Sequence, residues 1–442
     1  MAAGTLKVKH LMKLKICPVF LVVLVLTFST AFADDWPHWR GPARDGIVQE
    51  SSGYSGGKWA LKSLWKKPFG LGGSSPIVIG KSVYCLGWKN GLDTLYCVDL
   101  ASGKTNWKQS YKSPKYGRLS KGDKGIYSGP SSTPEYDSQT GLLYSLGTDG
   151  DLHCWDTKRK GKRTWSVNLH DILDIKVRKR IGRSAWRDYG FTTAPLVMGN
   201  KVLVEAGAME GNVVAFDKAT GKLAWTSQCK DQAGHTGGLV PITVERVPCV
   251  AVLTLNHLLV LRTDGANEGK TVAKYKWTTT FANNIATPAV FKNFVVITSA
   301  YNQGAICKLR ITLKGAEKVW KASYSSKVCS PLIVGGKVYF AWRQLRCLDL
   351  QSGKQLWSGG KFGDAGSCIV TSDGRIIVWG GRGRLVLAET ALRSPTKYRE
   401  LARRDRLARN DVWPHVVLSS GHLLCRDRLG AMQCFRLLNS AE

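Results

Sequence analysis

A short pattern recurs three times at long intervals along this chain. Each copy is an alternating apolar stretch that ends at an Asp, followed by a Gly four residues later and a Trp four residues after the Gly; the copies cover residues 95–107, 213–225 and 345–357. Fixed internal spacing repeated at long intervals is typical of repeat architectures, whose units bury their apolar faces against their neighbours. The chain is therefore expected to fold as an array of one supersecondary unit.

The unit itself predicts two strands joined by a tight turn. Alternation indicates the first strand, and the Asp at its end can accept hydrogen bonds from backbone N–H groups two residues on. The Gly supplies the positive φ of a tight turn, so the Trp lies on a second, outer strand. One small sheet cannot bury a Trp, but a second sheet stacked on it can. We therefore assign structural roles to the tryptophans of the strong and weaker copies, namely Trp65, Trp107, Trp165, Trp225, Trp277, Trp320 and Trp357.

A second signal marks where each repeat begins. It is a strand opening, most often a small residue followed by Pro, which is tolerated at the first residue of a strand. The openings lie near Ser75, Thr133, Ala194, Leu239, Thr287, Ser330, Ser367 and Trp413. Each begins four strands, except that the chain ends before the eighth repeat can supply its outer strand, while residues 62–67 form an unmatched strand ahead of the first repeat. The sequence predicts an all-β fold: an eight-bladed β-propeller of four-stranded antiparallel blades, its ring closed by an N-terminal strand.

The repeat unit resembles a known family. Its Asp-x-x-(Ser/Thr)-Gly-Lys-x-x-Trp form, with Ala or Cys two residues before the Asp, is similar to the repeat of PQQ-like (quinoprotein) β-propellers over residues 59–437. The lead-in at residues 36–46, Trp-Pro-His-Trp-Arg-Gly-Pro-Ala-Arg-Asp-Gly, resembles that of secreted bacterial members labelled as outer-membrane assembly propellers or as polyvinyl-alcohol-dehydrogenase-like proteins. The resemblance implies the fold, whereas a function has to be argued from the site.

The N-terminus predicts export. Four lysines precede an apolar run at residues 19–26, and Ala31-Phe32-Ala33 then gives the small-x-small pattern of signal cleavage. The run is shorter than the roughly 18 apolar residues of a membrane span, so no transmembrane segment is expected after cleavage. We predict a signal peptide at 1–33, a Trp- and Pro-rich strap at 34–58, the propeller at 59–437 and a tail at 438–442. The protein is expected in the periplasm or at the cell surface.

Twelve cysteines in an exported protein suggest disulfides. However, Cys97, Cys154, Cys347 and Cys434 occupy the same slot of different repeats, where the remaining strong copy has Ala215. This favours small core residues in separate blades over disulfide partners. Loss of the cysteine in the signal peptide leaves an odd number, so at least one thiol is expected to be free.

The net charge of +32 falls to +28 for residues 34–442, because residues 1–33 hold four Lys and no acid. Much of it lies at 158–187, where eleven Lys or Arg oppose two Asp, and at 393–409. Such fields attract polyanions. Export favours acidic polysaccharide, anionic lipid or envelope proteins over nucleic acid as partners, with Arg178, Lys179 and Arg180 as polyanion candidates. The alternative is a set of solvated loops.

No catalytic or metal motif is present. The chain lacks haem, zinc-protease, serine-hydrolase and Walker signatures, and its Asp-Gly stretches at 148–151 and 263–265 lack calcium-loop spacing and are read as turns. If a ligand binds, we expect it at the axis, where the loops entering the innermost strands converge. The candidate residues are Arg183, Trp186, Tyr189, His235, Asn283, Asn284, Lys327, Trp413 and His415, with Trp36, Trp39 and Arg40 from the strap.

Two classes of function remain. The favoured one is an exported, non-enzymatic β-propeller that acts as a binding or scaffold protein at the cell envelope and needs no cofactor. The alternative is a divergent alcohol or polyvinyl alcohol dehydrogenase that depends on PQQ and calcium. The resemblance implies that alcohol-oxidising members carry an adjacent Cys-Cys pair beside the cofactor, with an Asp base and a calcium carboxylate. This chain has no adjacent cysteines, which favours the first class.

Overall fold

The computed structural model describes residue 1 and residues 35–118, 120, 127, 129–176, 189–281 and 283–438. The chain divides into two units, residues 1–32 and 33–442, and the described strands all belong to the second. The expected signal peptide and the candidates Arg178, Lys179, Arg180, Arg183 and Trp186 lie outside the described residues. In the described part of the chain, no helix has both the length and the apolar character needed to cross a bilayer.

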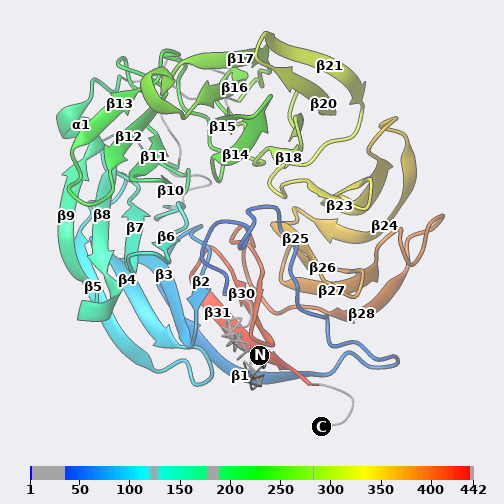
Figure 1. Ribbon diagram of the computed structural model, residues 1–442. Helices are drawn as coiled ribbons and strands as arrows, with labels where there is room; N and C mark the ends of the chain where they lie inside the picture. The colour runs from blue at the N-terminus through cyan, green and yellow to red at the C-terminus, as the bar shows by residue number, and fades with distance from the viewer. Residues whose placement is uncertain are drawn as a thin grey trace. The chain divides into compact units, whose positions relative to one another are not determined.

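The described strands form eight antiparallel sheets arranged as a ring, which confirms the predicted eight-bladed propeller (Figure 1). We number the blades in chain order and give the strands from the centre outward. Blades 1 to 3 consist of β2 (Ile77–Ile79), β3 (Ser82–Lys89), β4 (Leu92–Asp99) and β5 (Thr105–Lys112); β6 (Glu135–Asp137), β7 (Leu142–Leu146), β8 (Asp151–Asp156) and β9 (Lys162–Asn168); and β10 (Leu196–Met198), β11 (Lys201–Glu205), β12 (Val213–Asp217) and β13 (Leu223–Thr226).

The remaining blades follow the same plan. Blades 4 to 6 consist of β14 (Val240–Val244), β15 (Val247–Leu253), β16 (His257–Arg262) and β17 (Thr271–Lys276); β18 (Ala289–Phe291), β19 (Phe294–Ser299), β20 (Ala305–Thr312) and β21 (Gly315–Ala322); and β22 (Leu332–Val334), β23 (Lys337–Asp349) and β24 (Gln355–Gly363). Blades 7 and 8 consist of β25 (Ser367–Val370), β26 (Arg375–Gly380), β27 (Arg384–Glu389) and β28 (Glu400–Arg404); and β29 (Val417–Ser419), β30 (His422–Arg426), β31 (Ala431–Leu437) and β1 (Leu61–Pro68). Short helical turns lie between strands at α1 (Leu169–Ile172), η1 (Thr157–Arg159) and η2 (Gly265–Asn267).

Blade 6 reaches the same plan with one long strand. The first part of β23 pairs with β22, as Val338 does opposite Ile333, and its last part pairs with β24, as Cys347 does opposite Trp357. Between the two parts, Arg343 has a positive φ of 59°. β23 therefore supplies both middle positions of this blade.

The ring closes through the N-terminal strand, as the sequence predicts. β1 pairs antiparallel with β31, from Leu61 opposite Leu437 to Pro68 opposite Ala431. β31, the last strand in the chain, is thus covered on its outer side by β1, the first strand. The outer side of β31 is therefore paired, and β1 becomes the outermost strand of blade 8.

The tryptophan of one blade packs on the turn glycine of the next. Gly221 lies beneath the Trp165 ring so closely that a Cβ would come within 2.6 Å of it. The Trp165 Nε1–H donates to the carbonyl of Lys218 in the same turn at 3.0 Å. The pattern repeats where Trp65 covers Gly103, Trp107 covers Gly161, Trp225 covers Gly269 and Trp320 covers Gly353. Each pair links two neighbouring blades, and the pair of Trp65 and Gly103 links blade 8 to blade 1.

The repeat Asp shapes the turn that receives the tryptophan. In blade 3 the Asp217 carboxylate accepts hydrogen bonds from the backbone N–H of Thr220 at 2.9 Å and from its hydroxyl at 2.8 Å. The same pairing joins Asp349 to Ser352 in blade 6. There the hydrogen bond from the Ser352 backbone, with help from Lys337, lowers the pKa of Asp349 to about 2. The carboxylates therefore stay ionised and hold the turn.

The register corrects one sequence assignment. The slot that Trp107, Trp165, Trp225, Trp320 and Trp357 fill is taken by Ala273 in blade 4, opposite Val260. Trp277 comes just after β17, where it is buried and its Nε1–H donates to Ser299 at 2.9 Å. The sequence misplaced Trp277 because a loop with the turn η2 lengthens the connection between β16 and β17, which moves the outer strand along the chain.

We expect Trp165→Ala to destabilise the propeller by about 3–5 kcal/mol, as large aromatic deletions in packed sites do. The variant loses the contact with Gly221 and the hydrogen bond to Lys218. Trp165→Phe keeps a ring over the glycine and should lose less. Thermal and chemical denaturation measure both, with exposed Leu392→Ala as the control. A Trp165→Ala protein that melts with the control would contradict the interblade role.

Candidate binding site at the propeller axis

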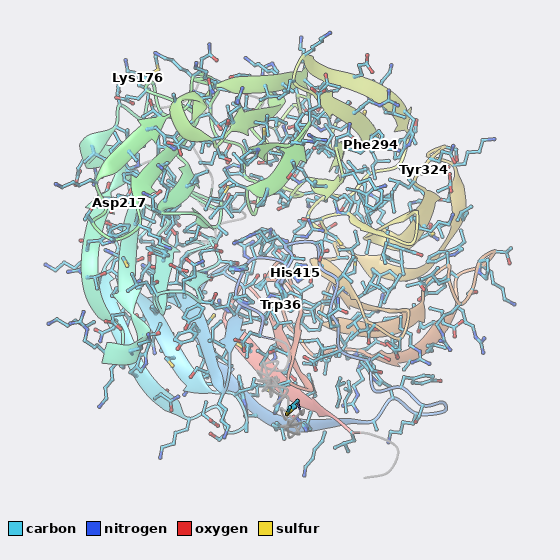
Figure 2. All side chains as sticks on the ribbon, viewed as in Figure 1. Trp36, Lys176, Asp217, Phe294, Tyr324 and His415 are labelled. Atoms are coloured by element: carbon cyan, nitrogen blue, oxygen red, sulfur yellow. The ribbon has the colours of Figure 1, made fainter. Side chains whose placement is uncertain are left out.

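The strap, defined here as residues 35–58, begins inside the ring and ends at its edge. Figure 1 shows the blue segment ahead of β1 crossing the centre of the ring. Figure 2 places Trp36 and His415 toward the centre, whereas Lys176 and Asp217 lie farther out. The sequence predicts that Trp36, Trp39 and Arg40 of the strap join the residues at the axis. The structure places these three residues there, against the inner strands and their entry loops.

Main-chain bonds attach the strap to the inner strands of blades 1, 2 and 7. Trp36 exchanges two backbone hydrogen bonds with Val78 of β2, at 2.8 and 3.0 Å. The Tyr136 N–H of β6 donates to the Pro37 carbonyl at 3.1 Å. Val370 of β25 bonds to the strap on both sides of Ile47. The strap therefore satisfies backbone groups that the short inner strands present to the axis.

Trp39 lies on the loops that lead into blades 4 and 5. A Cβ on Gly237 or Gly238 would come within 2.5 or 2.6 Å of its ring, so only glycine allows this approach. The Trp39 Nε1–H donates to the Thr287 hydroxyl at 2.9 Å. On another side, the ring of His415 from blade 8 meets Trp39 edge to face at 5.4 Å.

Arg40 is buried at the same level. Its guanidinium donates to the carbonyls of Pro331, of Asp45 at 3.0 Å and of Pro288 at 3.4 Å. Burial lowers the pKa of Arg40, and Asp45, Cys329 and Cys368 act in the opposite direction. These carbonyl contacts link the strap to the first residues of blades 5 and 6.

Glu135, at the start of β6, is the main ionic anchor of the strap. Its carboxylate accepts two hydrogen bonds from the Arg44 guanidinium and lies 3.0 Å from His38 Nδ1. It also accepts the backbone N–H of Val197 at 2.9 Å, which brings in blade 3. Burial raises the pKa of Glu135, but Arg44 and His38 outweigh this and lower it to about 2. The sequence analysis missed this site, although an acidic residue opening an innermost strand is its visible signal.

His415 of blade 8 contacts the strap. It is buried, its ring lies 5.7 Å from that of Trp36, and its Nδ1 bonds to the Val416 carbonyl at 2.7 Å. Burial lowers the pKa of His415 to about 3, so the ring is neutral near pH 7. His415 therefore packs against Trp36 and Trp39 of the strap.

The strap then runs outward over the turns that follow the inner strands of blades 7 and 8. Glu50 accepts the backbone N–H groups of Ser420 and Gly421, both at 2.6 Å. The Ser52 hydroxyl donates to Asp373 at 2.7 Å. The path ends at β1, so the axial segment and the closing strand are one continuous piece of chain.

We expect Glu135→Gln to lower stability by about 3–5 kcal/mol, because removing one partner of a buried ion pair leaves Arg44 uncompensated. Parent stability should fall in acid: the neutral form of His415 is favoured by folding, so its contribution declines below pH 6.5, and that of Glu135 declines from about pH 4.5 toward 2. The variant should lose the second decline. Melting temperatures between pH 3 and 8 and protease cleavage within residues 35–58 test this, with exposed Glu317→Gln as the control.

At the other end of the inner strands, the entry loops converge over the axis. Tyr189, which precedes blade 3, meets His235 edge to face at 5.2 Å and Trp413 at 5.5 Å. His235 belongs to blade 4 and Trp413 to blade 8, on opposite sides of the ring. One tyrosine thus connects opposing loops. We call the group of Tyr189, His235, Asn283 and Trp413 the axial mouth.

Polar contacts extend the axial mouth toward blade 5. His235 Nδ1 lies 2.8 Å from the Asn283 side-chain oxygen, and the Asn283 amide donates to the Tyr301 hydroxyl at 3.4 Å. The next residue, Asn284, is fully buried and donates to the carbonyls of Thr254 and Trp277 at 2.9 and 3.0 Å. Asn283 and Asn284 are both candidate ligand-binding residues in the sequence, but the structure places Asn283 at the axial mouth and Asn284 in the core.

Lys327 and Trp413 have charged neighbours on blades 6 to 8. Lys327 Nζ and the Trp342 indole both donate to Asp364 at 2.9 Å. Burial acts to lower the pKa of Lys327, but the hydrogen bond that Lys327 donates to Asp364 raises this pKa overall. The buried Arg428 guanidinium lies 4.3 Å from the Trp413 ring and 3.3 Å from Asp411. Aromatic faces, amides and paired charges of this kind suit sugar or carboxylate recognition.

The family comparison adds to this geometry. A family model described as outer membrane protein assembly factor BamB matches residues 93–359, more than half of the chain. The chain belongs to this family.

Solved structures of BamB and of quinoproteins share the fold. BamB from Moraxella catarrhalis superimposes with a TM-score of 0.57 and 13% identity, over 85% of this chain and 100% of that one. Quinohemoprotein alcohol dehydrogenase from Comamonas testosteroni gives a TM-score of 0.57 and 14% identity, over 91% and 80%. At these identities the likeness concerns the fold alone.

The curated relatives are larger enzymes. Quinohemoprotein alcohol dehydrogenase ADH-IIG of Pseudomonas putida is 29% identical over 34% of this chain, and the quinone-dependent alcohol dehydrogenase subunit of Komagataeibacter europaeus is 31% identical over 37%. The chain spans about a fifth of the length of each, 19% and 21%. Because the similarity covers only about a fifth of each enzyme, it does not show whether this chain has the activity of the whole enzyme.

A hollow of about 370 Å³ lies apart from the axial mouth in this BamB-family propeller. It is lined mostly by apolar side chains from blades 3 to 5, with one lysine: Met198, Pro241, Ile242, Thr243, Pro248, Cys249, Val290 and Lys292. Met198 ends β10 and Lys292 follows β18, whereas Pro241, Ile242 and Thr243 lie within β14 and Pro248 and Cys249 near the start of β15. The sequence analysis did not identify it.

Proposed function

We propose that this chain is an exported, non-enzymatic propeller that binds partners at the cell envelope, in the periplasm or at the cell surface. The observation that carries this proposal is the strap. The chain's own Trp36, Trp39 and Arg40 fill the centre of the ring, so the axial mouth and the outer edge remain as surfaces for a partner. Membership of the outer membrane protein assembly factor BamB family supports a protein partner.

The outer edge has a composition suited to a second kind of partner. Exposed basic side chains lie on the outermost strands of the blades or directly before them, among them Lys62, Lys66, Lys104, Lys108, Lys112, Lys162, Lys222, Lys270, Lys274, Lys276, Lys318, Lys321, Lys354, Lys361 and Arg403. Lysine on an edge strand also prevents pairing with other sheets, so the fold accounts for part of this charge. The excess supports binding of acidic glycan or anionic lipid as an additional role.

Replacing Arg178, Lys179 and Arg180 together by Ser should weaken retention on a polyanion column, because fewer contacts with the polyanion release fewer counterions in total. The matched control replaces Lys270, directly before β17, and Lys274 and Lys276 of β17 by Ser, which removes the same charge from the outer edge of blade 4. We expect an earlier salt elution for the first variant than for the control, with melting temperatures near that of the parent. If both variants elute at the same salt concentration, the weaker retention follows from net charge alone and not from the position of Arg178, Lys179 and Arg180.

The second candidate function is a divergent PQQ-dependent dehydrogenase, favoured by the local identity to quinone-dependent alcohol dehydrogenases. The residues do not fit a PQQ and calcium centre well. The chain has no adjacent cysteines. Its described part also contains no group of three or more His, Cys, Asp or Glu placed to hold a metal ion.

Titration of the purified protein with PQQ and calcium separates the two functions. Under the binding proposal, absorbance and tryptophan fluorescence show no saturable change at micromolar PQQ, and dye-linked oxidation of ethanol or polyvinyl alcohol stays at the level of a blank. Saturable binding together with turnover would replace the binding proposal by the enzyme.

A further inference from the structure

Two buried cysteines meet where blades 6 and 7 adjoin the strap. Cys329 precedes β22, Cys368 lies on β25, and their sulfur atoms are 3.5 Å apart. Both side chains are fully buried. Neither belongs to the tryptophan-facing slot that Cys97, Cys154 and Cys347 occupy. The core role that explains those residues therefore does not explain this pair.

The strap covers the two sulfurs from the axis. Gly46 approaches so closely that a Cβ there would lie 3.5 Å from the Cys368 carbonyl and 2.5 Å from the Leu332 side chain. The Arg40 guanidinium binds the Pro331 carbonyl, two residues after Cys329. A buried cation beside a thiol favours the thiolate, which is the form that attacks disulfides.

The two thiols are inequivalent. A hydrogen bond from Cys368 and, to a smaller extent, the charge of Arg40 lower the pKa of Cys329 despite its burial. The same contact, together with burial, raises the pKa of Cys368. Cys329 is therefore the thiol that ionises more readily, and Cys368 is placed to attack the sulfur of Cys329 in a second step.

We propose that Cys329 and Cys368 form a disulfide that joins blade 6 to blade 7 beneath the strap. The oxidant is an external disulfide, of a thiol oxidase or of glutathione. The Cys329 thiolate attacks one of its sulfurs and expels a thiolate. Cys368 then loses its proton and attacks Cys329, expelling the second thiolate. Two cysteine thiols are oxidised to one disulfide and the external disulfide is reduced to two thiols.

The burial of the pair determines when this reaction occurs. With the strap in place, an external disulfide has no access to either sulfur, so the bond forms during folding, before residues 35–48 enter the axis. The same cover then protects the bond from reductants. The inference needs only an oxidising compartment, which export provides, and does not depend on which partner the propeller binds.

The experiment refolds the full chain in a glutathione redox buffer, then unfolds it in an alkylating agent without reductant and analyses a digest by mass spectrometry. We expect one peptide pair joined through Cys329 and Cys368, two hydrogens lighter than the sum of its parts, with Cys347 and Cys434 alkylated. The linked protein should melt a few degrees above the reduced protein, because the bond closes a loop. Alkylation of both Cys329 and Cys368, or a link of either to another cysteine, would overturn the proposal.

Variants keep the test independent of folding failures. Cys329→Ala and Cys368→Ala should each abolish the link and leave the other cysteine alkylated, whereas Cys347→Ala should leave the link unchanged. Native linked protein should resist dithiothreitol, and Glu135→Gln, which loosens the strap elsewhere, should accelerate reduction. A bond reduced equally fast in parent and variant would refute the protective role of the strap. The binding proposal would be unaffected by any of these results.

Discussion

The contact between a tryptophan of one blade and the turn glycine of the next is the interaction on which this ring depends. A four-stranded blade has two apolar faces and cannot bury either alone. A tryptophan such as Trp165 reaches from the outer strand across to Gly221, fills the space that a Cβ would take and bonds to the Lys218 carbonyl. The Asp that holds the turn fixes the height of that carbonyl. Blade-to-blade distance is therefore specified by local sequence, and Trp65 on Gly103 extends the same rule across the closure.

The tryptophan contacts lie at the periphery of the ring and do not provide partners for the backbone groups at its centre. The inner strands are short, and β2, β10 and β18 have only three residues each. Their axial backbone groups and opening loops need partners, which the strap provides with its own main chain and with Trp39 and Arg40. Placing the strap at the axis buries a charge, because Arg44 is one of its residues. Glu135 compensates that charge, and its strongly lowered pKa is the consequence.

The sequence predicts the fold well because the pattern that defines it is local. The blade count, the strand openings and closure by residues 62–67 all follow from short motifs with fixed spacing, and β1 paired with β31 confirms the closure. Trp277 was misassigned for a local reason too, since a longer connection moved the slot to Ala273. The axial anchor could not be found this way. Nothing near Glu135 in the sequence points to Arg44, which lies 91 residues away, and Asn283 and Asn284 differ only in what surrounds them after folding.

Solved structures of an assembly factor and of a dehydrogenase share this ring, so the fold alone does not decide between the two proposed functions. A ring whose centre is occupied by its own chain has given up the most enclosed volume that a propeller offers. Under the binding proposal, the surfaces left for recognition are the entry loops around Tyr189 and Trp413 and the edges of the outer strands. Shallow surfaces made of aromatic and charged side chains favour large partners, which gain affinity from area and from a few anchoring residues rather than from enclosure. Under the same proposal, the strap both anchors the centre of the ring and restricts the kind of ligand that the propeller can take.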